Sequence, residues 1–327
     1  MATTFAQVVN KINCGGSGVR GTGNIFCDTD VKSLAILGFT RKNKSLASTT
    51  VIGASVYTDM IQKEEMTIVK GLVSTSDVTS GNEYQTYETG VKKLTNKNPY
   101  EIEVTLNKGI HNYKAINTLE SNALYDVWMF DEKNDCFIAL NKDGSIRGLD
   151  CLMVTVENYK VGKENSYLLR FQIDRNDFDN NLAVIKAENL GFEPKRTLDG
   201  YNDIDIRFIT PSAGLTVVLS TWAHNNNKHY GLFGMDAGDL RFEKATISSG
   251  VVTGWSVITG ITLAATGSAN DPDYTASFPS PFPMVSGDKY RVKTFDSSLN
   301  SDVIYVEGNF YKSYNPANEN YFEFTVL

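Results

Sequence analysis

The sequence predicts a mainly β protein with minor α content. We expect an antiparallel, barrel-like β core domain with one or two helices, followed by a C-terminal Ig-like β-sandwich. Residues suited to half-buried sheet surfaces are abundant, including 16 Tyr and 17 Phe among 327 residues. The chain is also rich in Asn and has 26 Gly against 8 Pro, a composition typical of many tight turns.

Composition and charge narrow the classes of function. With 41% hydrophobic and 21% charged residues, the chain can bury real cores, and its length suggests about two domains. Its net charge of −7 argues against sequence-specific nucleic-acid binding, which normally uses a basic face. No apolar run approaches the roughly 18 residues of a membrane span, and residues 1–10 lack the features of a secretory signal. We therefore expect no membrane partner and synthesis in a cytoplasm.

Residues 1–30 are predicted to form an N-terminal helix and a glycine-rich arm. Phe5, Val8, Val9 and Ile12 recur at helical spacing and share one face of a helix over 4–12. Such a short helix is marginal in water, so its apolar face must dock on something. It either folds back onto its own domain or crosses onto a neighbouring subunit as an oligomerisation arm.

The glycine-rich segment contains a literal G-x-G-x-x-G pattern at Gly16, Gly18 and Gly21. A dinucleotide site needs a preceding strand and a following helix, whereas here a predicted helix comes first and no helix follows. The segment is better interpreted as a tether, and no cofactor is expected.

Residues 31–239 are predicted to form the antiparallel core domain. Alternate residues from Tyr100 to Leu106 are apolar, which indicates a half-buried strand, and Asp143–Gly144 predicts a hairpin turn. Only short polar turns separate the strands between Leu124 and Ile173, so we expect an antiparallel meander there. Strands are predicted at 31–39, 49–56, 99–106, 124–130, 136–140, 149–159, 167–173, 182–185, 204–209, 214–222 and 230–233.

Two helices are predicted inside this domain. One covers 58–66, and the other begins at Asn112, whose side chain would cap a segment presenting Ile116, Leu119 and Ala123 on one face. The polar run 175–181 is interpreted as a boundary, and the strands after it as a returning part of the core domain.

Residues 240–327 are predicted to form the Ig-like β-sandwich. Short strands recur there at intervals near ten residues and are separated by Gly, Ser and Asn, as is typical of a small sandwich. They are expected at 241–247, 254–258, 261–265, 289–295, 303–307 and 321–327.

The sequence nominates no catalytic residue and no metal ligand. His224 and His229 lie in an Asn-rich stretch that is predicted to be a loop, and the four cysteines (Cys14, Cys27, Cys136 and Cys151) are interpreted as ordinary thiols. Asp174, Asp177 and Asp179 lie close enough together to leave a calcium site as an alternative to a solvated turn.

Four tyrosines stand among polar neighbours and are expected to be exposed: Tyr84, Tyr87, Tyr311 and Tyr314. They are ordinary surface tyrosines, subunit contacts or a carbohydrate-binding platform, and their pattern does not choose among these.

The order of several segments resembles virion structural proteins of tailed phages that infect Bacteroidetes-type hosts, including ring-forming tail or neck proteins of crAss-like phages. The resemblance rests on these segments: Cys14 to Cys27–Asp28 around the glycines, the apolar strand Val31–Phe39, Leu124–Glu132, Asp143–Gly144, and Leu168–Asn180. It spans roughly residues 10–185 and implies a β domain that oligomerises around the tail axis, with an outward-facing Ig-like domain. It implies no catalytic residues.

From this we expect a non-enzymatic structural subunit of a bacteriophage particle, located in the virion and assembled in the host cytoplasm. Its expected partners are further copies of itself in a ring or tube, together with other virion tail or portal proteins. A carbohydrate- or receptor-binding adhesin module is the alternative, and a hydrolase whose carboxylates the sequence does not single out is a third.

Overall fold

The structure is a computed structural model that describes residues 3–11, 33–107, 110–157, 159, 166–209, 214–225, 228–266, 273–280, 283–315 and 318–327. It is mainly β, as the sequence predicts. The chain divides into two compact units, the first made of residues 1–58 and 65–199 and the second of 59–64 and 200–327. No helix in the described ranges is both long and apolar enough to cross a membrane.

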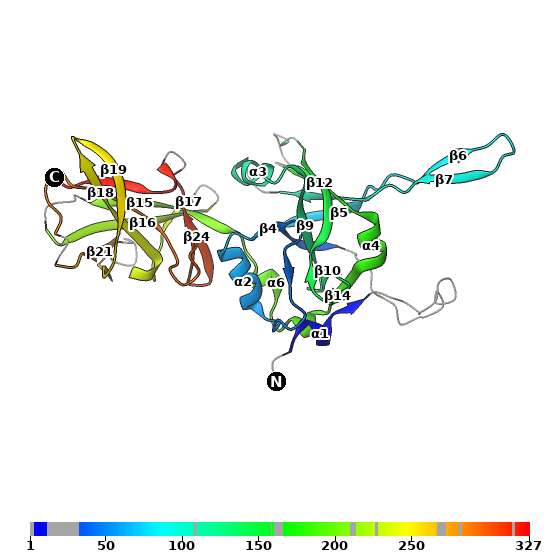
Figure 1. Cartoon of the computed structure of the whole chain (residues 1–327), viewed down its shortest axis with the longest axis horizontal. Coiled ribbons are helices and arrows are strands. Elements are labelled where there is room, and N and C mark those ends of the chain that lie inside the picture. Colours follow the sequence, from blue (N-terminus) through cyan, green and yellow to red (C-terminus); the bar gives the residue numbers. More distant parts are fainter. Residues whose placement is uncertain are drawn as a thin grey trace. The chain divides into compact units, whose positions relative to one another are not determined.

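The first unit is built on an antiparallel barrel-like sheet (Figure 1). Its strands are β2 (Leu34–Arg41), β4 (Met66–Lys70), β5 (Leu72–Asp77), β8 (Tyr100–Leu106), β9 (Ser121–Asp131), β12 (Leu149–Val156) and β13 (Tyr167–Ile173). β5 pairs with β8, and the hydrogen-bonded order continues through β13, β12 and β9 to β2 and β4. β4 runs directly into β5 through Gly71, whose φ of 80° allows the bend, and no described ladder pairs these two strands.

The apolar faces of these strands enclose one core, which includes Phe39, Val127, Leu169 and Phe171. β13 alternates strictly between buried and half-buried residues, as expected for a strand with one face on a core. The same sheet also contains β1 (Asn10–Lys11), β3 (Ser45–Leu46), β10 (Cys136–Leu140), β11 (Ile146–Arg147) and β14 (Leu182–Ile185). The helices in this part of the chain are α1 (Phe5–Val8), α2 (Ala54–Gln62), α3 (Ile110–Asn117), α4 (Arg175–Asn181), α5 (Ala187–Leu190) and α6 (Pro194–Thr197). A separate hairpin consists of β6 (Glu83–Thr86) and β7 (Lys92–Asn96).

The second unit contains two sheets. One holds β15 (Tyr201–Ile209), β16 (Thr216–Asn225), β17 (Lys228–Gly231), β20 (Thr262–Ala265), β21 (Asp273–Ser277), β23 (Val303–Val306) and β24 (Asn309–Ser313). The other holds β18 (Leu240–Ser248), β19 (Val251–Ile258), β22 (Lys289–Thr294) and β25 (Phe322–Thr325). A 3-10 turn at Ala237–Asp239 leads into β18. Residues of both sheets, such as Ile206, Leu219, Phe242 and Val292, form one hydrophobic cluster. The finer prediction of Ig-like topology stays a prediction.

Several predicted elements differ from the structure. The segment 49–56 is no strand: it is a turn followed by α2, which begins at Ala54 rather than at residue 58. Asn112 lies inside α3 instead of capping it, and Ala123 belongs to β9. The strands that the sequence does not predict include β4, β5, β6, β7, β21 and β24.

The predicted meander is correct in its strands but not in their order. β10 pairs with β9 and β14, whereas β12 pairs with β9 and β13. The long strand β9 pairs with β2 along one edge, and its other edge is shared by β10 near Phe130 and by β12 from Val127 back to Ser121. Short turns show that neighbouring strands are antiparallel, but they do not show which strands pair.

The two units divide at 199/200, well before the boundary that the sequence suggests at 239/240. The run 175–181 is a helix, α4, with Asp174 as its N-cap, and the chain stays in the first unit through α6. β15, β16 and β17, which the sequence predicts as part of the core domain, share a sheet with the C-terminal strands β23 and β24. β15 and β24 pair in parallel across about a hundred residues of sequence, which is a contact that no local pattern encodes.

Candidate functional site

The β6–β7 hairpin extends away from the barrel of the first unit (Figure 1). Every residue of both strands is exposed. A two-stranded hairpin without a packed face is marginally stable in water. Packing against another surface would therefore stabilise a hairpin of this kind.

Apolar side chains concentrate on this hairpin and on the strand that leads into it. The first unit exposes the apolar side chains Val51, Val73, Val78, Tyr84, Tyr87, Val91, Leu94 and Leu124, and all but the first and last lie between residues 73 and 94. Tyr84 stands opposite Leu94 across the two strands, and the backbone N–H of Tyr87 donates to the carbonyl of Val91. Cross-strand neighbours share a face, and successive pairs alternate, so both faces of the hairpin carry an apolar pair.

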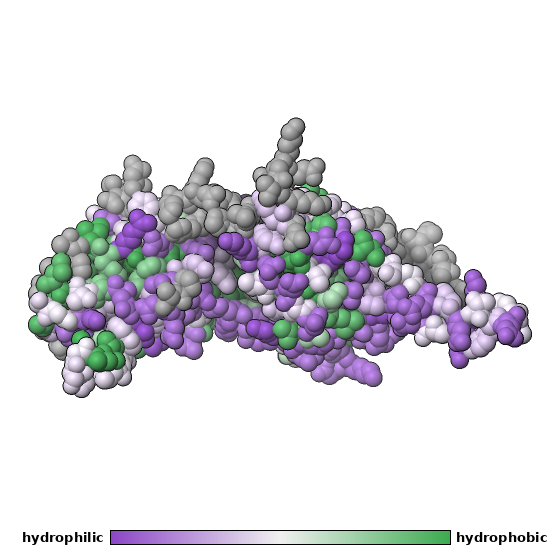
Figure 2. Space-filling model, turned by 90° about the horizontal axis from the view of Figure 1, so that it is seen from above, coloured by the Kyte–Doolittle hydropathy of each residue, from purple (hydrophilic) through white to green (hydrophobic). Residues whose placement is uncertain are grey.

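Charge on the hairpin is opposite in sign to the charge of the chain. Lys92, Lys93 and Lys97 outnumber Glu83 and Glu88, whereas the whole chain carries −7. The hairpin surface at the right-hand end of Figure 2 is accordingly a mixture of hydrophilic and neutral colours. Residues 83–97 therefore carry a net charge of +1, from three Lys and two Glu, opposite in sign to the charge of the whole chain.

The base of the hairpin is held by Arg175 at the start of α4. Its Nη1 donates to Asn82 Oδ1 at 3.1 Å and to the carbonyl of Asn98 at 3.3 Å, which joins both limbs of the hairpin. The guanidinium also lies over the Tyr100 ring, 4.8 Å from its centroid, and its Nε donates to Asp179 Oδ2. The Arg175 guanidinium thus holds the base of the hairpin to the barrel through several hydrogen bonds and a ring contact.

The N-terminal segment differs from the predicted oligomerisation arm. The helix is only the single turn Phe5–Val8, because the chain then continues as β1 and pairs with β14. Phe5 and Val8 are buried within their own chain, Val9 is half-buried, and the Phe5 N–H donates to the carbonyl of Thr50. Folding back, the other alternative, is the arrangement found for these residues. Ile12 and the glycines at 16, 18 and 21 lie outside the described residues.

The acidic residues considered for calcium are engaged by arginines or by backbone N–H groups. Asp177 receives two hydrogen bonds from Arg147, at 2.8 and 3.0 Å, and a third from the backbone N–H of Asp150 at 2.7 Å. Asp174 caps α4, and Asp179 pairs with Arg175. Within the described part of the chain, no group of three or more acidic, His or Cys side chains is arranged to hold a metal ion.

Asp126 is a fully buried carboxyl group beside this cluster. Its Oδ2 accepts a hydrogen bond from the Asn43 N–H at 2.8 Å, and its Oδ1 lies 3.9 Å from Arg147 Nη1. Burial raises the pKa of Asp126 to about 6, although the Asn43 hydrogen bond and the Arg147 charge oppose the shift. These contacts support a structural role, because the Asp126 side chain is fully buried and faces the Asn43 N–H and the Arg147 guanidinium.

The remaining candidates from the sequence are dispersed. Tyr84, Tyr87 and Tyr314 are exposed as predicted, but Tyr311 is buried in the core of the second unit. Cys136 and Cys151 are buried free thiols whose pKa values burial raises, to about 12 for Cys151, whereas Cys14 and Cys27 fall outside the described residues. His224 and His229 stand opposite each other on β16 and β17 rather than in a loop.

The four-stranded sheet of the second unit carries a stack of planar groups. The Arg291 guanidinium lies 4.4 Å from the Trp255 ring and 3.8 Å from the Tyr321 ring, and it pairs with Glu243. Burial alone would raise the pKa of Glu243, but hydrogen bonds from Arg291 and Tyr321 and the nearby Arg charges lower it overall. These side chains satisfy one another's charges, hydrogen bonds and ring faces. The stack therefore has a structural role.

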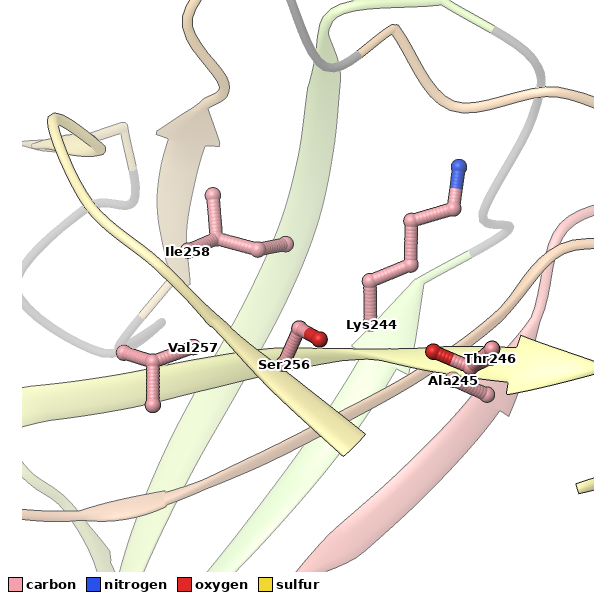
Figure 3. Close-up of a pocket in the computed structure, with 6 residues that line it drawn as sticks. All are labelled: Lys244, Ala245, Thr246, Ser256, Val257 and Ile258. Carbon is pink, nitrogen blue, oxygen red and sulfur yellow. The ribbon is translucent and has the colours of Figure 1, made fainter. Parts of the chain in front are cut away.

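A shallow hollow lies on the same sheet, lined by Lys244, Ala245, Thr246, Ser256, Val257 and Ile258 of β18 and β19 (Figure 3). The Lys244 ammonium is already held by Asp288 at 2.6 Å. Figure 3 shows the Ser256 and Thr246 hydroxyls at separate points along the two strands. The hollow thus offers aliphatic contact rather than a converging set of reactive groups.

No protein-family model matches this chain, and no curated protein matches it. The hairpin and its Arg175 anchor are therefore the strongest candidate functional feature on structural grounds. The sequence contains one signal for this feature, the tyrosines at 84 and 87, whose polar neighbours predict exposure but not a projecting hairpin.

Proposed function

We propose that this chain is a non-enzymatic structural subunit of a bacteriophage particle, in which it oligomerises into a ring or tube of the tail or neck. Its partners would be further copies of itself and other virion tail or portal proteins. Assembly would take place in the host cytoplasm, and the assembled protein would be part of the virion.

The observation that carries the proposal is the anchored, fully exposed hairpin with an apolar pair on each face. Inserting it against a neighbouring copy removes these side chains from water, at about 25 cal/mol per Å² of apolar surface. When each copy receives the hairpin of one neighbour and inserts its own into another, the contact is head-to-tail. A head-to-tail contact closes into a ring when its rotation permits and otherwise propagates as a tube or filament.

The barrel supports the same proposal, because a rigid body is needed to fix the direction in which the hairpin points. The Arg175 contacts transmit the orientation of β8 and α4 to both limbs of the hairpin. The bacteriophage setting rests on the sequence resemblance described above. The head-to-tail assembly rests on the hairpin.

Native mass spectrometry over a concentration series, with negative-stain images of the same sample, tests the proposal. We expect closed species of many copies, and we expect the double variant Tyr84→Ser/Leu94→Ser to weaken their assembly at least about tenfold, since each exposed side chain contributes roughly 1–2 kcal/mol when buried.

Leu124→Ser is the matched control, because Leu124 is comparably exposed in the same unit but lies outside the hairpin. It should assemble like the wild type. Equal assembly of the double variant and the wild type would remove the hairpin from the proposed interface.

A further inference from the structure

β19 is an edge strand of the four-stranded sheet, whose order is β19-β18-β22-β25. It pairs with β18 along one side, from Val251 opposite Ser248 to Ile258 opposite Phe242. No described strand pairs with its other side, and the described backbone hydrogen bonds of residues 251–258 all go to β18. Its outer edge therefore presents a row of backbone donors and acceptors.

Apart from a β-bulge at Thr253, this edge lacks the features that normally protect one. β19 reads VVTGWSVI and contains neither a charged residue nor a proline. Val251 is 65% exposed and Val257 is 48% exposed. β25, at the opposite edge of the same sheet, carries the charged residue Glu323. Long, uncharged, apolar edge strands are templates for pairing with another chain.

The composition of β19 favours a second copy of itself as the partner. We consider an antiparallel pairing of two β19 strands that is centred between Gly254 and Trp255. In this register, the apolar end Val251–Val252 of each copy lies opposite the apolar end Val257–Ile258 of the other. The polar residues Thr253 and Ser256 fall between these ends. Because the strand is uncharged, self-pairing brings no like charges together, a repulsion that would oppose the pairing of most surface strands.

We propose that β19 pairs with β19 of a second copy and joins the two four-stranded sheets into one continuous antiparallel sheet. The contact is isologous and two-fold, because the same strand contributes from both copies. It goes beyond the head-to-tail contact of the hairpin and does not depend on it. Together, the two contacts would join one ring to a second.

Amide hydrogen exchange on the intact protein over a concentration series tests the pairing locally. Residues 251–258 should become more protected as concentration rises, because their outward N–H groups gain partners only in the dimer. Val257→Lys, which places a charge on the edge, should abolish this increase, and Val251→Lys should act in the same way.

Val285→Lys is the control, since Val285 is also exposed in the second unit and lies in no strand. It should keep the concentration dependence, as should the hairpin variant Tyr84→Ser/Leu94→Ser, which keeps this test separate from that of the proposed function. Full protection in a sample that native mass spectrometry shows to be monomeric would show that the chain itself covers the edge. That result, like exchange that stays fast at every concentration, would overturn the proposal.

Discussion

At the scale of single residues, Asp126 shows how burial sets ionisation in the barrel. Its ordinary pKa of 3.8 rises to about 6, so the folded protein binds a proton there that the unfolded chain has already lost. The folded protein accommodates the protonated carboxyl group of Asp126 better than its carboxylate. The folded state is therefore favoured below about pH 4, and this advantage is lost as pH rises through 6.

We predict that Asp126→Asn removes this pH dependence. Between pH 4 and pH 8, the free energy of unfolding of the variant should rise by about 2–3 kcal/mol relative to that of the wild type. This is the free energy that corresponds to the pKa shift of Asp126. Urea unfolding of both proteins across this pH range measures it. A difference that does not change with pH would contradict the buried-charge interpretation.

Glu243→Gln supplies a control with the opposite sign. Because the arginine and tyrosine contacts hold the pKa of Glu243 below its ordinary value, its ionised form stabilises the folded state above the unfolded pKa. The destabilisation caused by Glu243→Gln should thus be largest at neutral pH and should shrink as pH falls through the acid range.

At the scale of elements, Arg175 determines how firmly the β6–β7 hairpin is held. We predict that Arg175→Lys loosens the hairpin root, because a single ammonium cannot donate to Asn82 and Asn98 and also lie flat over Tyr100. Tryptic cleavage at Lys92 and Lys93 should accelerate roughly threefold to tenfold, as expected when local opening becomes about 1 kcal/mol easier.

Arg207→Lys is the matched control, since Arg207 pairs with Asp205 on a strand of the second unit. It should leave the rate of hairpin cleavage unchanged. An Arg175→Lys protein that is cut at the wild-type rate would show that other contacts hold the root.

The N-terminal element shows how tertiary contacts override a local pattern. The helical spacing of Phe5, Val8 and Val9 is real, but helix formation stops after one turn. The following residues, Asn10 and Lys11, instead complete an edge of the sheet beside β14. A short helix gains little by itself in water, so ladder hydrogen bonds to an existing strand outweigh the propagation of the helix.

At the scale of the whole molecule, each unit has its own hydrophobic core. We predict two thermal transitions, of which Gly148→Ala lowers only the one that belongs to the barrel. A Cβ on Gly148 would lie 2.8 Å from the backbone nitrogen of Val127, a contact that β9 cannot relieve without moving. Overpacking of this kind costs about 1–3 kcal/mol, or roughly 3–10 °C in that transition.

Differential scanning calorimetry measures this effect, with Gly53→Ala as the control. A Cβ on Gly53 meets only the Ser55 hydroxyl at 4.0 Å and should change neither transition. A single transition lowered as a whole by Gly148→Ala would mean that the two units unfold together.

Local sequence patterns were enough to predict the β class, the strands around Tyr100–Leu106 and Tyr167–Ile173, and the turn at Asp143–Gly144. Each of these depends on neighbours within a few residues, through side-chain alternation or a positive φ at glycine. Exposure of Tyr84 and Tyr87 followed in the same way from their polar surroundings.

Strand pairing, the division between the two units and the contacts of Arg175 depend on residues far apart in the chain, so they emerged only from the folded structure. β9 lies between β2 on one side and β10 and β12 on the other, and β15 joins β24 in parallel. In each case the backbone donors are satisfied by a strand that the tertiary fold brings alongside. The unprotected edge of β19 belongs here too. Its composition is visible in the sequence, but its position at the edge of a sheet comes from the pairing of β18 with β22 on the other side.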